Sequence, residues 1–569
     1  MKKLIYIFLT FCILPILTAC NEEEILNEQP LDFLTIENAL VNPDDVGNSI
    51  ISLYDLSRRY FGDASSNGDN FDMYMGTDAG FHARFYDSHV LSAYPAFTAD
   101  DPFTIQRWER AFRIIFDANI ILNKINEIDF EDESLKTKYI AEAKFFRAWS
   151  YRNLVHLYGD VPLILEDSTD PRADYVRTPK EEVWAQIIED FNFAKDNLPS
   201  VGEINEDGRL VKAAAYHYLS EMYITTGSFQ LAVEAASWVI DSGNYSLMTQ
   251  RFGSRIGEPG DVYWDLFRLN NQNRESGNTE SIWVHQVDYL TPGGYGLPNG
   301  SDANRYERII GPEYNRWIAR NENPGVRTFI FESTYHGGRG QGWFRPTGLV
   351  THTIWNGNEA NDIRTSDANI LRKWTVDNPE SVHFGDIIDI GNPDIYYSYI
   401  QPDQIEIDTN RYLYPTFLKL TMINNHFPTE LENGVGPRMV GGARRLYTDQ
   451  YAIRLAETYL LRAEAFLGLG NLQAAADDIN VVRSRANAIP VDPSEVNLDY
   501  ILDERLRELF LEEPRRLTLA RLGLVYERTV KYNPYAAPFI QEFNNLYPIP
   551  AQELRVNNEN ELQQNPGYN

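Results

Sequence analysis

The apolar and polar residues follow a helical period near the C-terminal end of the chain. From Gln450 to Asn487, apolar residues recur at three- and four-residue steps, which places them in one stripe along an α-helix. The stripe consists of Ala452, Leu455, Ala456, Tyr459, Leu460, Ala463, Phe466 and Leu467. Gly468 and Gly470 interrupt it, and Asn471 can cap a second amphipathic helix over 472–485. The pattern predicts a helical hairpin.

A second copy of this hairpin lies upstream, from Lys212 to Tyr245. Aligning Gly227 with Gly470 also aligns Tyr216 with Tyr459, Glu221 with Glu464, Phe229 with Leu472 and Ala232 with Ala475. An aromatic residue, a glycine and an alanine at these intervals are typical of a tetratricopeptide unit. One such hairpin cannot cover its own apolar face, so the copies must stack. We therefore predict a mostly α-helical, tetratricopeptide-like scaffold.

The region from Leu31 to Pro199 also has a helical period, clearest over Ala111–Ile125 and Ile140–Tyr158. The second of these segments carries large apolar side chains on several faces, so we expect it to be mostly buried. Trp108 precedes apolar residues at helical spacing, and we predict that it belongs to the core.

The middle of the chain, over 251–446, loses this period and is rich in Gly, Pro, Asn and Asp. Short β-like runs occur at Ser281–Val287 and Arg327–Phe331. An irregular segment of this length is too long for a passive connection, so a functional role is expected. The fold prediction is thus a helical scaffold with a large, loop-rich insertion containing short β elements. The predicted divisions are a signal peptide (1–19), an acidic tether (20–30), an N-terminal helical region (31–250), the insertion (251–446) and a C-terminal helical region (447–569).

The N-terminus has the pattern of a secretory signal, with Lys2 and Lys3 before an apolar run over 4–17. That run is short for a membrane span, which needs about 20 residues. The sequence Leu-Thr-Ala before Cys20 resembles a bacterial lipobox. Cys20 would then carry diacylglycerol and a third acyl chain such as palmitate. An ordinary signal followed by an unmodified thiol is the alternative.

Cleavage of the signal would remove Cys12 and leave Cys20 as the only cysteine, which excludes an intramolecular disulfide. The 82 acidic and 51 basic residues give a net charge of −31. A nucleic-acid role needs a basic surface, and the sequence has no large Lys/Arg cluster. The glutamates at 22–24 form either a solvated tether or a surface-export tag.

Four blocks in this order resemble the SusD/RagB family. They are AEAKFFRAWSYRNLVHLYGDVPLI at 141–164, the hairpin around Ala456-Glu457, ERLRELFLEEPRRLTLARLG at Glu504–Gly523, and YPIPAQELRVNNENELQQNPGY at Tyr547–Tyr568. The stretch Leu511–Arg516 departs from the family, which more usually has Gly-His before Arg. The resemblance implies an outward-facing outer-membrane lipoprotein that captures a nutrient, commonly an oligosaccharide. It also implies that the protein hands this nutrient to a SusC-like TonB-dependent transporter.

Sugar recognition requires flat apolar ring faces together with amides, carboxylates and guanidiniums for the hydroxyls. Two loop-rich stretches meet this requirement, Phe71–Phe97 and Gly340–Asn358. In the family the ligand typically meets the N-terminal segment and the insertion, without a fixed motif. The candidate ligand residues are Asp78, His82, Arg84, Tyr86, Tyr94, Tyr295, Trp343, Arg345 and Trp355. Further insertion aromatics are Trp264, Trp283, Trp317, Phe344 and Trp374.

The sequence also bears on other classes of function. The sequence has no HExxH, GxSxG or Walker motif and no paired-cysteine metal spacing, so we predict no catalytic residue, metal or cofactor. A glycosidase needs only two facing carboxylates, which a sequence cannot exclude. A free peptide-binding adaptor and a peptide ligand in the same fold are the remaining alternatives.

Overall fold

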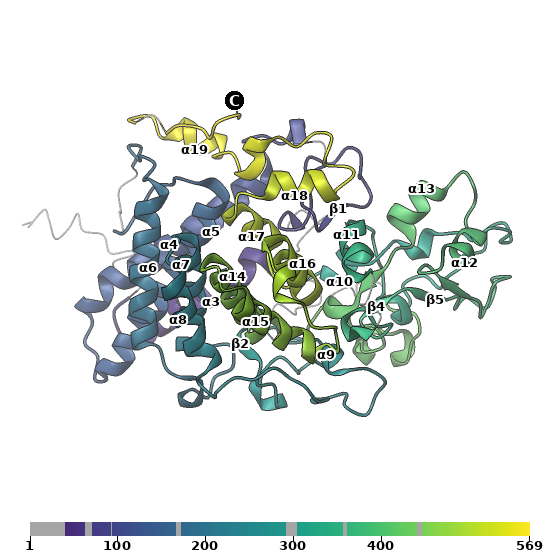
Figure 1. Cartoon of the computed structure of the whole chain (residues 1–569), viewed down its shortest axis with the longest axis horizontal. Helices are drawn as coiled ribbons and strands as arrows, with labels where there is room; N and C mark the ends of the chain where they lie inside the picture. The colour runs from purple at the N-terminus through teal and green to yellow at the C-terminus, as the bar shows by residue number, and fades with distance from the viewer. Residues whose placement is uncertain are drawn as a thin grey trace, which may run out of the picture.

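The computed structural model describes residues 40–62, 71–92, 94–166, 172–291, 304–356, 361–440, 446–560 and 562–568. The predicted signal, Cys20, the acidic tether and Tyr295 lie outside the described residues. Helices dominate both ends of the described chain, and short strands and turns dominate its middle (Figure 1). Within the described ranges, no helix is both long and apolar enough to span a bilayer.

The N-terminal helices pack side by side in chain order, at one end of the molecule in Figure 1. They are α3 (Pro43–Gly62), α4 (Pro102–Lys124), α5 (Glu133–Tyr158), α6 (Lys180–Asn197), α7 (Lys212–Thr225) and α8 (Phe229–Ile240). Helix α5 lies at the centre and is buried from Ala141 to Tyr158 except at Lys144, which confirms the predicted buried helix. Trp108 on α4 is also buried, as predicted.

The two predicted hairpins are present and stack on each other. α7 and α8 form the first, and α14 (Leu455–Gly468) and α15 (Leu472–Arg485) form the second. Gly227 and Gly470 each have a φ of +73°, the left-handed conformation that glycine adopts readily. The ring of Phe229 on α8 packs so closely on Gly468 that a Cβ there would lie 2.5 Å from it. The repeat prediction is therefore confirmed.

The start of the second hairpin differs from the prediction. Residues 450–454, which include Ala452, form strand β8 (Gln450–Arg454), and the helix begins only at Leu455. Strand β8 pairs antiparallel with β2 (Ser281–His285), with Trp283 opposite Ile453. The prediction of helix over these residues is wrong because a distant strand supplies their hydrogen-bond partners. The predicted strand at Ser281–Val287 is confirmed as β2.

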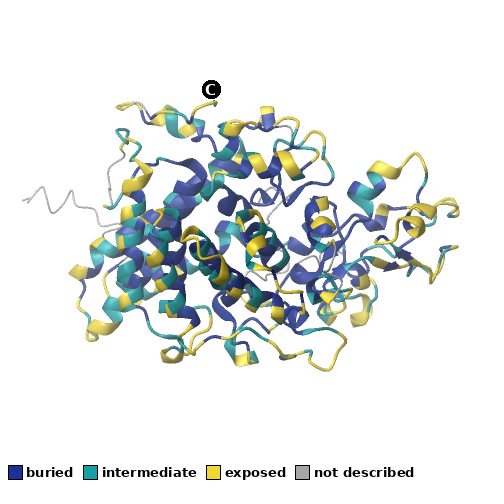
Figure 2. Ribbon diagram, in the orientation of Figure 1, coloured by how far each residue is buried: buried dark blue, intermediate teal, exposed yellow. Residues whose placement is uncertain are grey.

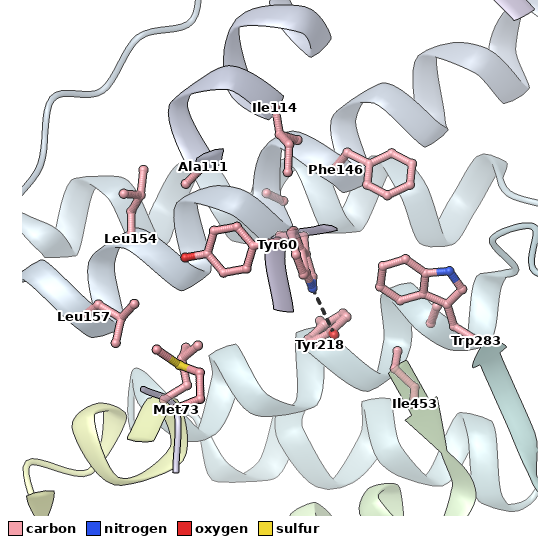
Figure 3. Close-up of a cluster of buried hydrophobic side chains, with 14 of the residues drawn as sticks. Tyr60, Met73, Ala111, Ile114, Phe146, Leu154, Leu157, Tyr218, Trp283 and Ile453 are labelled. Atoms are coloured by element: carbon pink, nitrogen blue, oxygen red, sulfur yellow. Dashed lines mark hydrogen bonds between the residues drawn. The ribbon is translucent and has the colours of Figure 1, made fainter. Parts of the chain in front are cut away.

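The main core joins this strand pair to the helices (Figure 3). Trp283 and Ile453 face side chains of α5 and α7, and the indole nitrogen of Trp149 donates to the Tyr218 hydroxyl at 3.1 Å. Burying each large apolar side chain stabilises the fold by about 1.5–3 kcal/mol.

The rest of the insertion consists of short elements. They are α9 (Val262–Asp265), α10 (Tyr306–Ile310), α11 (Gly348–Thr351), α12 (Pro393–Ser398), α13 (Ile405–Ile407), β3 (Phe344–Pro346), β4 (Ile370–Leu371), β5 (Lys373–Thr375), β6 (Ile387–Asp389) and β7 (Thr416–Phe417). The predicted strand at Arg327–Phe331 is wrong, because this segment is irregular and Phe329 packs beside Trp317 and Trp374 in a second core.

Most of the insertion aromatics are structural. Trp264, Trp283, Trp317, Trp343, Phe344 and Trp374 are all buried. Exposed residues gather instead along the outer edge of the lobe formed by α12, α13 and β5 (Figure 2).

Buried ion pairs tie the insertion to the C-terminal helices. These helices are α16 (Leu498–Leu509), α17 (Arg515–Arg521), α18 (Val525–Tyr532) and α19 (Ala551–Val556). The carboxylate of Glu508 on α16 contacts Arg364 at 3.0 Å, Arg454 at 2.5 Å and also Arg485. Where the sequence departs from the family pattern, the Glu513 carboxylate accepts a hydrogen bond from Arg505 at 2.8 Å. The buried carboxylate at this departure from the family pattern therefore has a partner within the scaffold.

Candidate functional site

The two stretches selected from the sequence meet in one small sheet. Strand β1 (Gly80–His82) lies in the first stretch and pairs antiparallel with β3 in the second. Phe81 is opposite Arg345, and His82 is opposite Phe344. The N-terminal segment and the insertion thus share one surface, which neither forms alone.

The segment before β1 is held by the C-terminal helices. Asp78 is completely buried and forms ion pairs with Arg515 at 2.6 Å and Arg528 at 2.9 Å. Burial alone would raise the pKa of Asp78, but the two guanidiniums together lower it below its usual value. The side-chain amide of Asn533 also donates to the carbonyl of Gly80 at 3.0 Å. These contacts fix the position of β1.

Aromatic rings pack beside Phe81 of this sheet. The ring of Tyr535, in the loop after α18, lies 4.7 Å from Phe81 and 4.9 Å from Tyr86, measured between centroids. Tyr86 and Tyr535 are both half-buried, so each ring keeps an accessible part. We name the group formed by Phe81, Tyr86, Arg345, Asn410 and Tyr535 the β1–β3 platform. Phe81 and Asn410 are buried within it, and Tyr86, Arg345 and Tyr535 are half-buried.

Polar groups complete the platform. Nη1 of Arg345 donates to the side-chain oxygen of Asn410, and the Asn410 amide donates to the Tyr535 hydroxyl. The guanidinium of Arg345 lies 5.6 Å from the centre of the Phe81 ring. Burial lowers the pKa of Arg345 and raises that of Tyr86, with the exposed Glu406 raising the latter further. The platform combines ring faces, an amide and a guanidinium, which are the groups that recognise a sugar.

The other candidate residues occupy different environments. His82, Tyr94 and Trp343 are buried, and the Tyr94 hydroxyl accepts a hydrogen bond from Arg516 at 2.9 Å. With Asp78, they support the platform from within the protein. Arg84 and Trp355 are half-buried, and the Trp355 indole nitrogen donates to the carbonyl of Val350 at 2.7 Å.

Sequence reasoning missed Asn410 and Tyr535. Asn410 lies in a π-helical turn over Asp408–Tyr412, and Tyr535 follows an Asn-Pro pair outside both selected stretches. Neither has a local signal of ligand contact, because its position beside β1 depends on tertiary packing.

Two hollows lie away from the platform. A groove of about 930 Å³ is bordered by α4, the segment over 162–178 and the C-terminal residues around Val556. An internal cavity of about 100 Å³ lies between Trp149, Tyr306 and Gln450. No group of three His, Cys, Asp or Glu residues suited to a metal ion occurs in the described part of the chain.

Comparison with known proteins gives a consistent result. A family model described as "Starch-binding associating with outer membrane" matches residues 56–224, and one described as "SusD family" matches residues 440–568. The "SusD-like protein P2" of Formosa agariphila is 27% identical over 483 residues, which cover 81% of this chain and 80% of that protein. The "Starch-binding protein SusD" of Bacteroides thetaiotaomicron is 37% identical over 125 residues, covering 21% and 22% of the two chains.

Solved structures agree on the fold. A structure titled "Laminarin binding SusD-like protein" superimposes with a TM-score of 0.64 at 23% identity, covering 93% of this chain and all (100%) of that chain. A SusD homolog from Bacteroides thetaiotaomicron superimposes with a TM-score of 0.66 at 21% identity, covering 94% and 98%. The helical scaffold with an irregular insertion is the fold of these proteins. The chain belongs to the SusD/RagB family.

Proposed function

We propose that this protein captures an oligosaccharide or polysaccharide at the outer face of the outer membrane and passes it to a SusC-like TonB-dependent transporter. The observation that carries the proposal is the pairing of β1 with β3, which assembles the platform from the two stretches selected for sugar recognition. The family description as starch-binding and associated with the outer membrane, and the starch-binding relative, support the same class of ligand.

The platform binds its ligand without changing it. The rings of Tyr86 and Tyr535 offer apolar faces to the C–H groups of a sugar ring. Arg345, held by the buried amide of Asn410, offers a guanidinium to its hydroxyl groups. Incubation with candidate glycans, followed by chromatography, checks that the glycan is left intact. Shortened products would reveal an enzyme instead.

Acyl chains on Cys20 anchor the protein in this proposal. Each buried CH₂ group of an acyl chain contributes about 0.8 kcal/mol, so several chains hold the protein firmly on the membrane. The acidic residues at 22–24 would then separate the folded part from the lipid surface. The transporter partner is tested by co-purification from outer membranes after mild detergent extraction.

A glycan array tests ligand capture directly. The mature chain, beginning at Cys20 and kept in detergent, is applied to immobilised plant, algal and microbial glycans, with a peptide digest as the competing class. We expect a defined set of glycans to bind and the peptides not to bind. Binding of peptides alone would favour the peptide-binding alternative and refute glycan capture.

A further inference from the structure

We propose that the β1–β3 platform takes an acidic glycan, and that Arg345 binds an oxyanion of the sugar. The oxyanion is the carboxylate of a uronic acid or a sulfate ester. This inference rests on the proposed function and specifies the ligand of the same site. The argument begins with the surroundings of Arg345.

Arg345 lacks a counter-charge in the described part of the protein. Its side chain has one hydrogen bond there, from Nη1 to the amide oxygen of Asn410, and its Nε is buried without an acceptor. No carboxylate of the described residues lies within 4.0 Å of its guanidinium. Burial acts most strongly on its pKa, and the neighbouring side chains that act on it next are Tyr396, Tyr535, Tyr414 and Tyr397, none of them a carboxylate.

Several other arginines near the platform have carboxylate partners. Arg515 and Arg528 both contact Asp78, and Arg411 contacts Glu313 at 2.5 Å. Acidic residues outnumber basic ones by 82 to 51, so counter-charges are abundant in this chain. A guanidinium held away from water without a counter-ion destabilises a fold. Burial accordingly lowers the pKa of Arg345.

The aromatic rings around Arg345 compensate only part of the free energy lost by burying an unpaired guanidinium. The guanidinium lies 5.6 Å from the ring centre of Phe81 and 5.9 Å from that of Tyr414. Contacts of this kind contribute about 0.5–2 kcal/mol. A bound oxyanion would supply the missing negative charge. It would also accept hydrogen bonds from the unused N–H groups of Arg345.

A second unpaired cation lies beside the platform. Arg84 is half-buried, lies 5.5 Å from the ring centre of Phe85, and has no ion pair among the described residues. Burial raises the pKa of Tyr86 and Tyr535, and the exposed carboxylates of Glu406 and Asp87 raise it further. Arg345 acts on Tyr535 in the opposite direction. An acidic sugar would place its oxyanion at Arg345, away from these carboxylates.

A neutral sugar would satisfy Arg345 less well. A hydroxyl group accepts a hydrogen bond but leaves the positive charge uncompensated, whereas a carboxylate or sulfate compensates the charge and accepts two parallel hydrogen bonds. The platform should therefore discriminate by charge as well as by ring shape.

Matched probes test the inference on the unaltered mature chain. Isothermal titration calorimetry compares oligogalacturonate with its methyl ester, and a sulfated galactan oligosaccharide with its desulfated form. We expect the acidic member of at least one pair to bind at least about tenfold more tightly, and the pair that responds identifies the oxyanion. This preference should weaken as salt is raised, because ions screen the charges.

Variants then assign the preference to Arg345. Arg345→Met should remove the tenfold preference, so that the acidic and the neutral member of the pair bind this variant with affinities within about twofold of each other. Arg345→Lys keeps the charge but loses the planar fork, so it should retain part of the preference. Arg113→Met is the matched control, because that arginine is on α4 with a side chain 65% exposed. Circular dichroism melts report whether each variant is folded.

The outcomes separate this inference from the proposed function. Equal affinity of the unaltered protein for both members of each pair would overturn the inference and leave glycan capture standing. A preference that persists in folded Arg345→Met would overturn the role of Arg345. Failure of the chain to bind any glycan on the array would refute the proposed function, and this inference with it.

Discussion

Arg515 forms an ion pair with Asp78 across 437 residues of sequence, with Nη2 of the arginine 2.6 Å from Oδ2 of the aspartate. The Nε of Arg528 reaches the same oxygen at 2.9 Å. Asp78 lies two residues before β1, so helices α17 and α18 set the position of the first strand of the platform. The conformation of the β1–β3 platform thus depends on the C-terminal helices.

Replacing Asp78 should destabilise the protein. In Asp78→Asn, the buried Arg515 and Arg528 lose their shared counter-charge, and breaking such a buried pair costs about 3–5 kcal/mol. Urea denaturation followed by circular dichroism should show a clearly lower transition midpoint. Asp87→Asn is the control because Asp87 is an exposed residue of the same segment, and its midpoint should stay unchanged. Equal midpoints for both variants would show that the ion pair contributes nothing to stability.

Tyr535→Ala should weaken glycan binding. The substitution removes a ring that contacts Phe81 and Tyr86, together with the hydroxyl that accepts from Asn410. We expect an affinity loss of at least about tenfold, or ~1.4 kcal/mol, in calorimetry with the best glycan from the array. Tyr335→Ala, which removes an aromatic residue that is 51% exposed, should bind normally. Equal affinities for the two variants would place the ligand elsewhere, and the 930 Å³ groove would be the next surface to test.

The free energy of unfolding should depend on pH through the histidines in the loop after β1. His82 and His89 stack with centroids 4.5 Å apart, and burial lowers the pKa of His89 to about 4. The unfolded histidine takes up a proton below about pH 6.5, but the folded one does so only near pH 4. The free energy of unfolding should therefore fall as the pH is lowered from 6.5 to 4, by roughly 2–3 kcal/mol from this residue.

His89→Asn isolates this contribution, because asparagine does not titrate and can still accept the hydrogen bond from the Leu91 backbone N–H. Its free energy of unfolding, measured in urea at several pH values, should change less between pH 6.5 and 4 than that of the unaltered protein. The same pH slope in both proteins would show that the protonation of His89 is not linked to folding.

Cys20→Ala tests the anchor. Without the thiol no acyl chain can be attached, so the protein should leave the membrane fraction and appear in the soluble fraction of cell lysates. Its affinity for the array glycan should stay the same, because the platform lies in the folded part of the chain. Retention of the variant in the membrane fraction would contradict the lipobox prediction.

The sequence alone determined the features that depend on neighbouring residues. The helices around Gly227 and Gly470 follow from a 3.6-residue apolar period and from glycines suited to a left-handed turn, both of which are local properties. The same holds for the buried α5, whose apolar residues occupy several faces. The pairing of the two hairpins also followed, because neither can cover its own apolar face.

Tertiary structure decided everything that depends on a distant partner. Residues 450–454 have a helix-compatible pattern, yet they form a strand because β2 supplies hydrogen bonds from far along the chain. Asp78 is a carboxylate in an aromatic loop, but Arg515 and Arg528 make it an internal support of the platform. Asn410 and Tyr535 join the platform only because the chain folds them beside β1. Local patterns carry no record of such long-range contacts, so the sequence could indicate two candidate stretches, but only the structure shows that they pair in one sheet.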